Sequence, residues 1–197
     1  MIKWKTIVLT LLLSLVACGG GGGVEKRVVA FYGDSITEGT HSAKYDEWFP
    51  ERWLPTPVEH IAALANIIGI DYSVNGASSV DAVIKQDNSS IVVIRFGVAD
   101  TVRNMSPEVF RTAITRLVAE ARAHGKRVIL TGLTHTADKD TSVLNRVMQE
   151  CANSLGVEFI DIYSLPFSPT TDLADTLHPA EGYSRRIGEE IAKYLKE

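Results

Sequence analysis

The stretch of sequence that decides the fold lies near the start of the chain and reads Phe31-Tyr32-Gly33-Asp34-Ser35-Ile36-Thr37-Glu38-Gly39. It continues a short apolar run from Arg27 whose β-branched centre predicts a buried strand. Gly33 ends this strand, and Asp34 and Ser35 follow at once on a turn. Open α/β sheets place their chemistry at the carboxyl ends of strands. Ser35 is therefore a candidate nucleophile, although the same tripeptide is common in ordinary turns.

Short apolar runs alternate with segments of helical periodicity along the rest of the chain. We expect strands at 27–32, 70–74, 91–96, 127–130 and 157–162. We expect helices at 58–68, from the turn at 75–79 to about 85, from 106 to 125, at 144–155, and from about 179 onward. Gly69, Gly125 and Gly156 are expected to end the first, third and fourth of these helices. Five strands alternating with helices predict a three-layer α/β/α sandwich around an about five-stranded parallel sheet.

Composition bounds the class of protein. The chain has 197 residues, of which 45% are hydrophobic, enough for one domain with a substantial core. The net charge of -4 and the absence of a Lys/Arg block give no support for a nucleic-acid partner. Only Cys18 and Cys151 occur, so we expect no disulfide framework, and Cys151 lies on the apolar stripe of a helix as an inert core thiol.

Residues 1–17 have the features of a signal peptide, because Lys3 and Lys5 precede an apolar run that is too short for a confident membrane span. The run ends in Leu15-Val16-Ala17-Cys18, which resembles the lipobox of bacterial lipoproteins. The resemblance implies a lipid on Cys18, attachment to a membrane of the bacterial cell envelope and, because no aspartate follows, an outer-membrane location. The alternative is a plain secretory signal cut near Ala17. Residues 18–23 would then be the lipidated cysteine and a Gly-rich tether, and 24–197 the folded domain.

A second motif lies directly before the last expected helix and reads Asp175-Thr176-Leu177-His178-Pro179. A histidine can act as general base for a serine hydroxyl when its tautomer and orientation are fixed. Asp175, three residues earlier, can bend back to the imidazole of His178 and fix both. The alternatives are a helix-capping or surface histidine and an ordinary loop acid.

The two end motifs together resemble the SGNH (GDSL) hydrolase family over about residues 28–196. The resemblance implies a flavodoxin-like SGNH hydrolase fold with Ser35 as nucleophile, His178 as general base and then acid, and Asp175 orienting His178. It also implies hydrolysis or transfer of an acyl group through an acyl-enzyme, with neither a metal nor an organic cofactor. We expect a small-molecule or carbohydrate ester as substrate, acetyl esters among them.

The family holds the oxyanion with the backbone N–H of the nucleophile and with donors from two middle blocks, and both blocks depart from the pattern here. The first reads Asn75-Gly76-Ala77-Ser78-Ser79, in which Gly76 and Ser79 are the candidate donors beside Ser35. The second reads Gly97-Val98-Ala99-Asp100, with Ala99 at the position of the family asparagine. An alanine methyl cannot replace the missing amide.

Loss of one oxyanion donor costs on the order of 10²–10³ in rate in other enzymes. Three explanations of Ala99 stay open. Arg103, Asn104 or a water replaces the donor, the enzyme is slow, or the chain is a non-catalytic envelope- or glycan-binding lipoprotein. An acyltransferase that uses the same Ser35 intermediate is a further alternative.

Two other histidines and an aromatic segment are further candidates for a role at the site. The segment 41–57 is irregular and aromatic, so it is either a lid or wall of the site or a loop that caps the core. His41 is expected at the surface. His135 follows the fourth strand and is expected to face solvent, with substrate contact as the alternative.

Overall fold

The computed structural model describes residues 25–41 and 52–196. Five strands form one sheet in the order β2-β1-β3-β4-β5, and each neighbouring pair is parallel. Their bounds are β1 (Val28–Gly33), β2 (Ile68–Asp71), β3 (Ile91–Arg95), β4 (Arg127–Thr131) and β5 (Glu158–Ile160). The predicted parallel sheet is confirmed, with β3 at its centre and β1 and β4 on either side of it.

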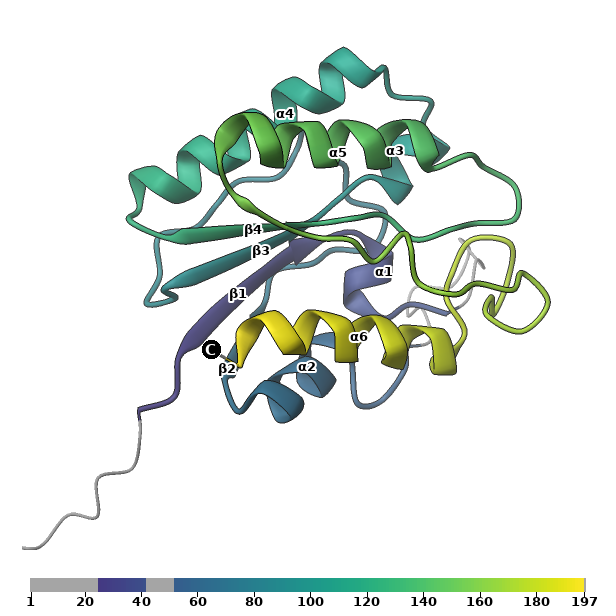
Figure 1. The fold of residues 1–197 in the computed structure, drawn as a ribbon, viewed down its shortest axis with the longest axis horizontal. Helices are drawn as coiled ribbons and strands as arrows, with labels where there is room; N and C mark the ends of the chain where they lie inside the picture. The colour runs from purple at the N-terminus through teal and green to yellow at the C-terminus, as the bar shows by residue number, and fades with distance from the viewer. Residues whose placement is uncertain (1–24, 42–51, 197) are drawn as a thin grey trace, which may run out of the picture.

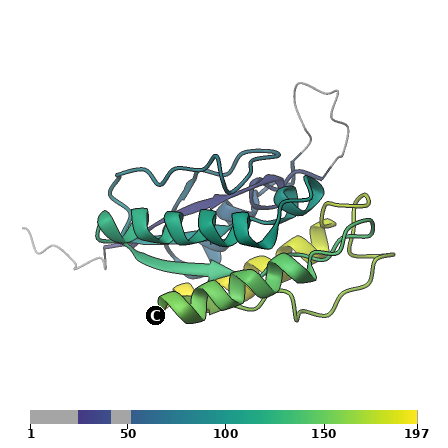
Figure 2. The same ribbon diagram turned by 90° about the horizontal axis from the view of Figure 1, so that it is seen from above.

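Helices cover both faces of the sheet (Figure 1). They are α1 (Ser35–Glu38), α2 (Pro57–Ala65), α3 (Val98–Val102), α4 (Pro107–Ala123), α5 (Ser142–Leu155) and α6 (Glu181–Leu195). α3, α4 and α5 lie on one side of the sheet, and α2 and α6 lie on the other (Figure 1). Seen from above, α4 and α5 run side by side (Figure 2). The three-layer sandwich is therefore confirmed.

Alternation along the strands divides the core into two clusters. Val92 and Ile94 of β3 face the cluster under α4 and α5, whereas Val93 faces the cluster under α2 and α6. Cys151 belongs to the first cluster and is 1% exposed, and burial raises the pKa of its thiol. The prediction of an inert core thiol agrees with this environment.

The first expected helix is shorter than its apolar pattern indicated. Thr56 and Glu59 form a capping box at the start of α2, and Asn66 ends the helix in a left-handed conformation, with φ 53°. Gly69 therefore lies within β2 rather than at the end of a helix, and β2 begins two residues before the expected strand. The periodicity could not reveal that an asparagine, rather than a glycine, adopts the left-handed conformation.

The helix expected up to about residue 85 does not form, and this prediction was wrong. The segment 72–85 is irregular, because its backbone finds partners elsewhere in the fold. The N–H of Ile84 donates to a carboxylate oxygen of Glu120 at 3.1 Å, and the N–H of Lys85 donates to the hydroxyl of Tyr32 at 2.8 Å. These tertiary hydrogen bonds replace those of a helix and hold the segment across the sheet face.

The expected signal peptide, lipidated cysteine and Gly-rich tether lie outside the described residues, as does most of the aromatic segment. Within 25–41 and 52–196, no helix is long and apolar enough to cross a membrane. His41 is half-buried rather than fully at the surface, and its ring stacks on Trp53 with centroids 4.1 Å apart.

Candidate active site

The turn that carries Ser35 is fixed by its two preceding residues. Ser35 is the first residue of α1, and Asp34 caps this short helix by accepting a hydrogen bond from the Ile36 N–H at 3.1 Å. A Cβ on Gly33 would lie 2.0 Å from the Thr37 hydroxyl oxygen. Only glycine fits there, so the chain can turn sharply from β1 into α1 and leave Ser35 at the carboxyl edge of the sheet.

Asp34 also fastens α1 to α3. Its second carboxylate oxygen accepts from the N–H of Ala99 at 3.2 Å, and the residue is 1% exposed. Burial raises the pKa of Asp34, while the N–H donors of Ala99 and Ile36 act in the opposite direction. One buried carboxyl therefore joins the turn of the nucleophile to the sequence block at 97–100.

The structure brings the three candidate triad residues together. The Nε2 atom of His178 lies 3.1 Å from the Oγ of Ser35, and its Nδ1 lies 2.8 Å from Oδ2 of Asp175. Ser35 is 4% exposed and His178 is 3% exposed. The geometry meets the requirement of a nucleophile within hydrogen-bond reach of a base that a third group orients.

Asp175 is held in place by its own backbone loop. Its Oδ1 accepts hydrogen bonds from the N–H groups of Leu177 and His178, both at 2.7 Å. Partial burial acts to raise the pKa of Asp175, but these bonds and the His178 ring outweigh it and hold the pKa below its ordinary value. Asp175 is thus ionised at neutral pH and favours the tautomer of His178 that carries its proton on Nδ1.

The loop around His178 is closed by a hydrogen bond of its own and is tied to two other parts of the fold. Its backbone pairs with itself through the Ala174 N–H and the His178 carbonyl at 2.9 Å. The indole N–H of Trp53 donates to the Pro179 carbonyl at 3.1 Å. The Ala137 N–H donates to the Thr176 carbonyl at 2.8 Å. Trp53, whose role the sequence did not reveal, thus supports the residue next to the base.

Of the backbone N–H groups of Ser35, Ser79 and Ala99, two are committed to other partners. The N–H of Ser79 donates to a carboxylate oxygen of Asp100 at 3.0 Å, so it is not free in this structure. Asp100 is fully buried and also accepts from the Ser78 hydroxyl. The N–H of Ala99 is bound to Asp34. Within the described part of the chain, only the N–H of Ser35 among these three donors lacks an acceptor.

The remaining donor candidates are not brought to Ser35 by any contact in the described residues. Gly76 lies in a turn with φ 68° and has open space where a Cβ would be. Arg103 and Asn104 are exposed after the end of α3. Replacement of the missing asparagine amide by Arg103, Asn104 or a water therefore stays a prediction.

His135 is not the solvent-facing residue that was expected. It is half-buried, its Nε2 lies 2.9 Å from the Tyr163 carbonyl oxygen, and its ring packs against those of Tyr163 and Phe167. These contacts give it a structural role at the carboxyl edge of β4. Its sequence context carried no signal for them, because the partners lie about 30 residues further along the chain.

Metal-ligating side chains do not gather anywhere in the described residues. No group of three or more His, Cys, Asp or Glu side chains there is arranged to hold a metal ion. The expectation that the reaction needs neither a metal nor an organic cofactor stays a prediction from the family resemblance.

A serine bonded to a histidine that is itself bonded to an aspartate, at the edge of a parallel sheet, is the arrangement of side chains found in serine hydrolases. The chain belongs to the GDSL-like lipase/acylhydrolase family, whose model matches residues 31–185. A search of curated proteins found no match. Membership of the family therefore rests on this match, and solved structures of other proteins show the same fold.

Solved structures of similar fold include three hydrolases. A lipase/acylhydrolase from Enterococcus faecalis has a TM-score of 0.71 and 21% identity, covering 86% of this chain and 95% of its own. Est24, a carbohydrate acetylesterase from Sinorhizobium meliloti, has a TM-score of 0.72 and 17% identity, covering 86% and 98%. An aryl esterase from M. smegmatis has a TM-score of 0.72 and 18% identity, covering 86% and 98%.

Proposed function

We propose that this protein is a serine esterase that hydrolyses small acyl esters, including acetyl esters of carbohydrates. The observation that carries the proposal is the hydrogen-bonded series from Ser35 through His178 to Asp175. Family membership supports ester hydrolysis as the reaction class. The carbohydrate acetylesterase of similar fold supports acetylated sugars as candidate substrates.

The mechanism follows from the positions of the three side chains. Nε2 of His178 takes the proton of the Ser35 hydroxyl as its Oγ attacks the ester carbonyl. The charged imidazole is stabilised by Asp175, and it then donates the proton to the departing alkoxide. A water attacks the acyl-enzyme while His178 takes its proton, and His178 then returns this proton to the Oγ of Ser35 as the bond to the acyl group breaks and the acid product leaves.

Stabilisation of the oxyanion is the weak step of this mechanism. The N–H of Ser35 at the start of α1 is the donor we assign to it, because the N–H groups of Ser79 and Ala99 are bound to carboxylates. A single donor supplies less transition-state stabilisation than the usual two or three. We therefore propose a slow esterase.

The direct test is hydrolysis of p-nitrophenyl acetate by the protein and by two serine variants. Ser35→Ala should abolish release of p-nitrophenol, because no acyl-enzyme can form. Ser90→Ala is the matched control, since Ser90 is exposed at the opposite end of the sheet, just before β3, and should leave the rate unchanged. Equal rates of p-nitrophenyl acetate hydrolysis by the wild-type protein and Ser35→Ala would refute the proposal.

A non-catalytic glycan-binding lipoprotein is the second candidate, favoured by Ala99 at the asparagine position. A fluorophosphonate probe separates the two, because it reacts with a serine that its histidine activates. Labelling of the wild-type protein but not of Ser35→Ala favours the esterase, and no labelling of either favours the binding protein. Product analysis with an added alcohol or sugar acceptor tests the acyltransferase alternative.

We further propose that the protein is lipid-anchored through Cys18 to the outer membrane of a bacterial cell envelope. The support is the sequence Leu15-Val16-Ala17-Cys18 after an apolar run. Mass spectrometry of the mature amino terminus should find an acylated Cys18. An unmodified terminus cut near Ala17 would instead indicate a secreted protein.

A further inference from the structure

Arg95, the last residue of β3, carries its positive charge inside the protein. The residue is 6% exposed, and its Nη2 atom has no hydrogen-bond acceptor in the part of the chain that the structure describes. A buried cation without acceptors is costly unless an opposite charge lies nearby. The fold is therefore expected to supply a negative group close to Arg95.

The strand register places Arg95 beside the nucleophile turn. On the neighbouring strand β1 it is paired with Gly33, which directly precedes Asp34 and Ser35. The Thr37 hydroxyl of α1 donates to the Arg95 carbonyl oxygen at 3.4 Å, and a Cβ on Gly33 would lie 2.7 Å from this same oxygen. The backbone of Arg95 is thus in close contact with the turn that carries the nucleophile.

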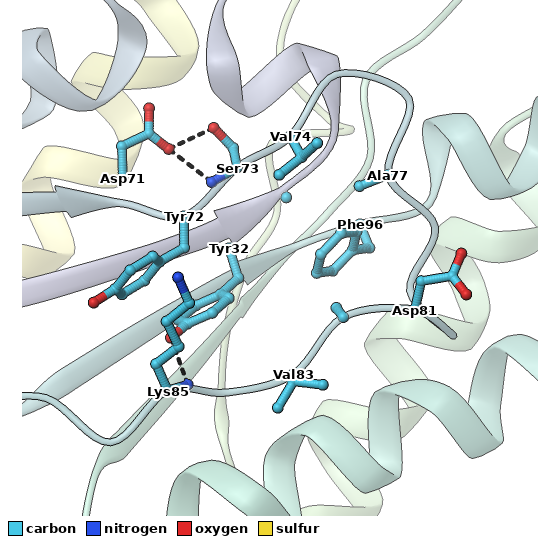
Figure 3. Close-up of a pocket in the computed structure, with 12 residues that line it drawn as sticks. Tyr32, Asp71, Tyr72, Ser73, Val74, Ala77, Asp81, Val83, Lys85 and Phe96 are labelled. Atoms are coloured by element: carbon cyan, nitrogen blue, oxygen red, sulfur yellow. Dashed lines mark hydrogen bonds between the residues drawn. The ribbon is translucent and has the colours of Figure 1, made fainter.

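The side chain of Arg95 faces the layer of α2 and α6. Its neighbours Ile94 and Phe96 belong to the core cluster under α4 and α5, and Phe96 lines a pocket on that side beneath the irregular segment 72–85 (Figure 3). Successive side chains of a strand point to opposite faces of the sheet. Arg95 therefore points away from this pocket, toward the cluster that contains Tyr183 of α6.

Asp34 supplies the opposite charge. Burial lowers the pKa of Arg95 to about 10, whereas Asp34 and then Tyr183 act to raise it, so Arg95 is protonated at neutral pH. Burial raises the pKa of Tyr183 to about 12, so its hydroxyl is uncharged there. Burial also raises the pKa of Asp34; two backbone N–H donors and the charge of Arg95 oppose this, and Asp100 of α3 acts with burial.

Two other buried carboxylates near the turn have partners of their own. Glu38 at the end of α1 forms an ion pair with Arg52. Asp100 accepts hydrogen bonds from two serines of the segment 75–79. The hydrogen bonds described for Asp34 come from backbone N–H groups, which carry no net charge. Among the described residues, Arg95 is therefore the cation that balances Asp34.

We infer that Arg95 is a positioning residue, whose buried guanidinium is the countercharge of Asp34 and, through Asp34, holds the Ser35 turn against α3. The inference rests on the proposed function, because Ser35 is the nucleophile of that reaction. The ionised Asp34 offers one oxygen to the Ile36 N–H of α1 and the other to the Ala99 N–H of α3. Protonation would turn one oxygen into a hydroxyl, which is a poorer acceptor, and would loosen the turn.

The countercharge is tested without substrate, by carbon NMR titration of the Asp34 carboxyl, whose signal is assigned by its loss in Asp34→Asn. The pKa of Asp34 should rise by about 1 or more in Arg95→Met, because a nearby cation favours the carboxylate. It should stay near the wild-type value in Arg95→Lys, which keeps the charge. Arg111→Met is the matched control, since it removes a 43% exposed arginine of α4 that pairs with Glu150. An unchanged pKa of Asp34 in folded Arg95→Met would overturn the inference.

The effect on catalysis is tested by a double-mutant cycle on kcat for p-nitrophenyl acetate. Arg95→Met and Asp34→Asn should each lower kcat by about tenfold or more, because a small displacement of the nucleophile is costly. If Arg95 acts through Asp34, adding Arg95→Met to Asp34→Asn should lower kcat by no more than about twofold further. Arg95→Lys should retain most of the wild-type kcat. Losses that multiply in the double variant would show that Arg95 acts independently of Asp34 and would overturn the inference.

Tyr183→Phe tests the other group that faces Arg95. The Tyr183 hydroxyl is fully buried and has no hydrogen-bond partner within 25–41 and 52–196, so its removal should leave kcat and the pKa of Asp34 unchanged. A loss of kcat as large as that in Arg95→Met would make Tyr183 the partner and overturn the inference. Arg95→Gln repeats the loss of charge if Arg95→Met does not fold. Unfolding of both neutral variants, with Arg95→Lys folded, would assign the cation to the core rather than to the turn and would also overturn it.

The two proposals fail in different ways. Hydrolysis of p-nitrophenyl acetate that depends on Ser35, with an unchanged pKa of Asp34 in Arg95→Met, would keep the esterase and refute the role of Arg95. A raised pKa of Asp34 in Arg95→Met without any Ser35-dependent hydrolysis would refute the esterase, and with it the catalytic part of the inference.

Discussion

The most informative perturbation is Ala99→Asn, which restores an amide side chain to α3. In the structure, the N–H of Ala99 is bound to Asp34 and that of Ser79 to Asp100, so the oxyanion has the Ser35 N–H as its assigned donor. One added donor is worth about 2.7–4 kcal/mol in the transition state, or about 10²–10³ in kcat. Because the donor acts on the developing charge, KM should change little.

The assay compares kcat and KM for p-nitrophenyl acetate in the wild-type protein, Ala99→Asn and Ala99→Leu. Leucine has the same number of side-chain heavy atoms as asparagine, branched at the same carbon, but no donor, so Ala99→Leu separates a steric effect at this 9% exposed position from hydrogen bonding. The gain should also vanish when Ser35→Ala is added. A folded Ala99→Asn with an unchanged kcat would refute the reasoning that a missing donor limits the rate.

Three further predictions follow from the described contacts. In Asp175→Asn, kcat should fall by about 10⁴. The hydrogen bonds to Asp175 lower the pKa of its carboxyl, so the carboxylate contributes to stability above about pH 4, and this contribution is lost at lower pH. The melting temperatures of the wild-type protein and the variant should therefore converge from about pH 5 to about pH 3. Gly33→Ala should lower the free energy of unfolding in urea by at least about 2 kcal/mol, because the new Cβ would meet the Thr37 side chain, whereas an unchanged midpoint would contradict the close packing. Lys126→Met should cost about 3 kcal/mol in the same urea assay, because it leaves the partly buried Asp87 without its cation, and a loss below about 1 kcal/mol would contradict this.

Much of the architecture could be predicted from local patterns, because strand composition and helix caps are local signals. Ser106 and Pro107 begin α4 as expected, and Gly156 ends α5 in a left-handed conformation. The irregular segment 72–85 could not be predicted in this way. Its backbone partners, the Glu120 carboxylate and the Tyr32 hydroxyl, lie 36 and 53 residues away, and no local pattern reports them.

In the candidate site too, local contacts could be predicted from the sequence and long-range contacts could not. The spacing of Asp175 and His178 is local, and the structure agrees that the carboxylate bends back to the imidazole. The partner of Ser79 is not local, since its N–H donates to the carboxylate of Asp100, which lies 21 residues further along the chain. Sequence reasoning could therefore name the bases and acids of the site, but not which backbone donors are already engaged.

The distance along the chain between Ser35 and His178 has a consequence for synthesis. The two residues are 143 positions apart, and all the strands after β1 lie between them in the sequence. A chain that emerges from the ribosome in order cannot form this hydrogen bond until His178, which follows all five strands, has emerged. A polypeptide that ends before residue 178 would carry Ser35 but no base. The proposed hydrolysis therefore requires a chain translated beyond the last strand of the sheet, through the loop that carries His178.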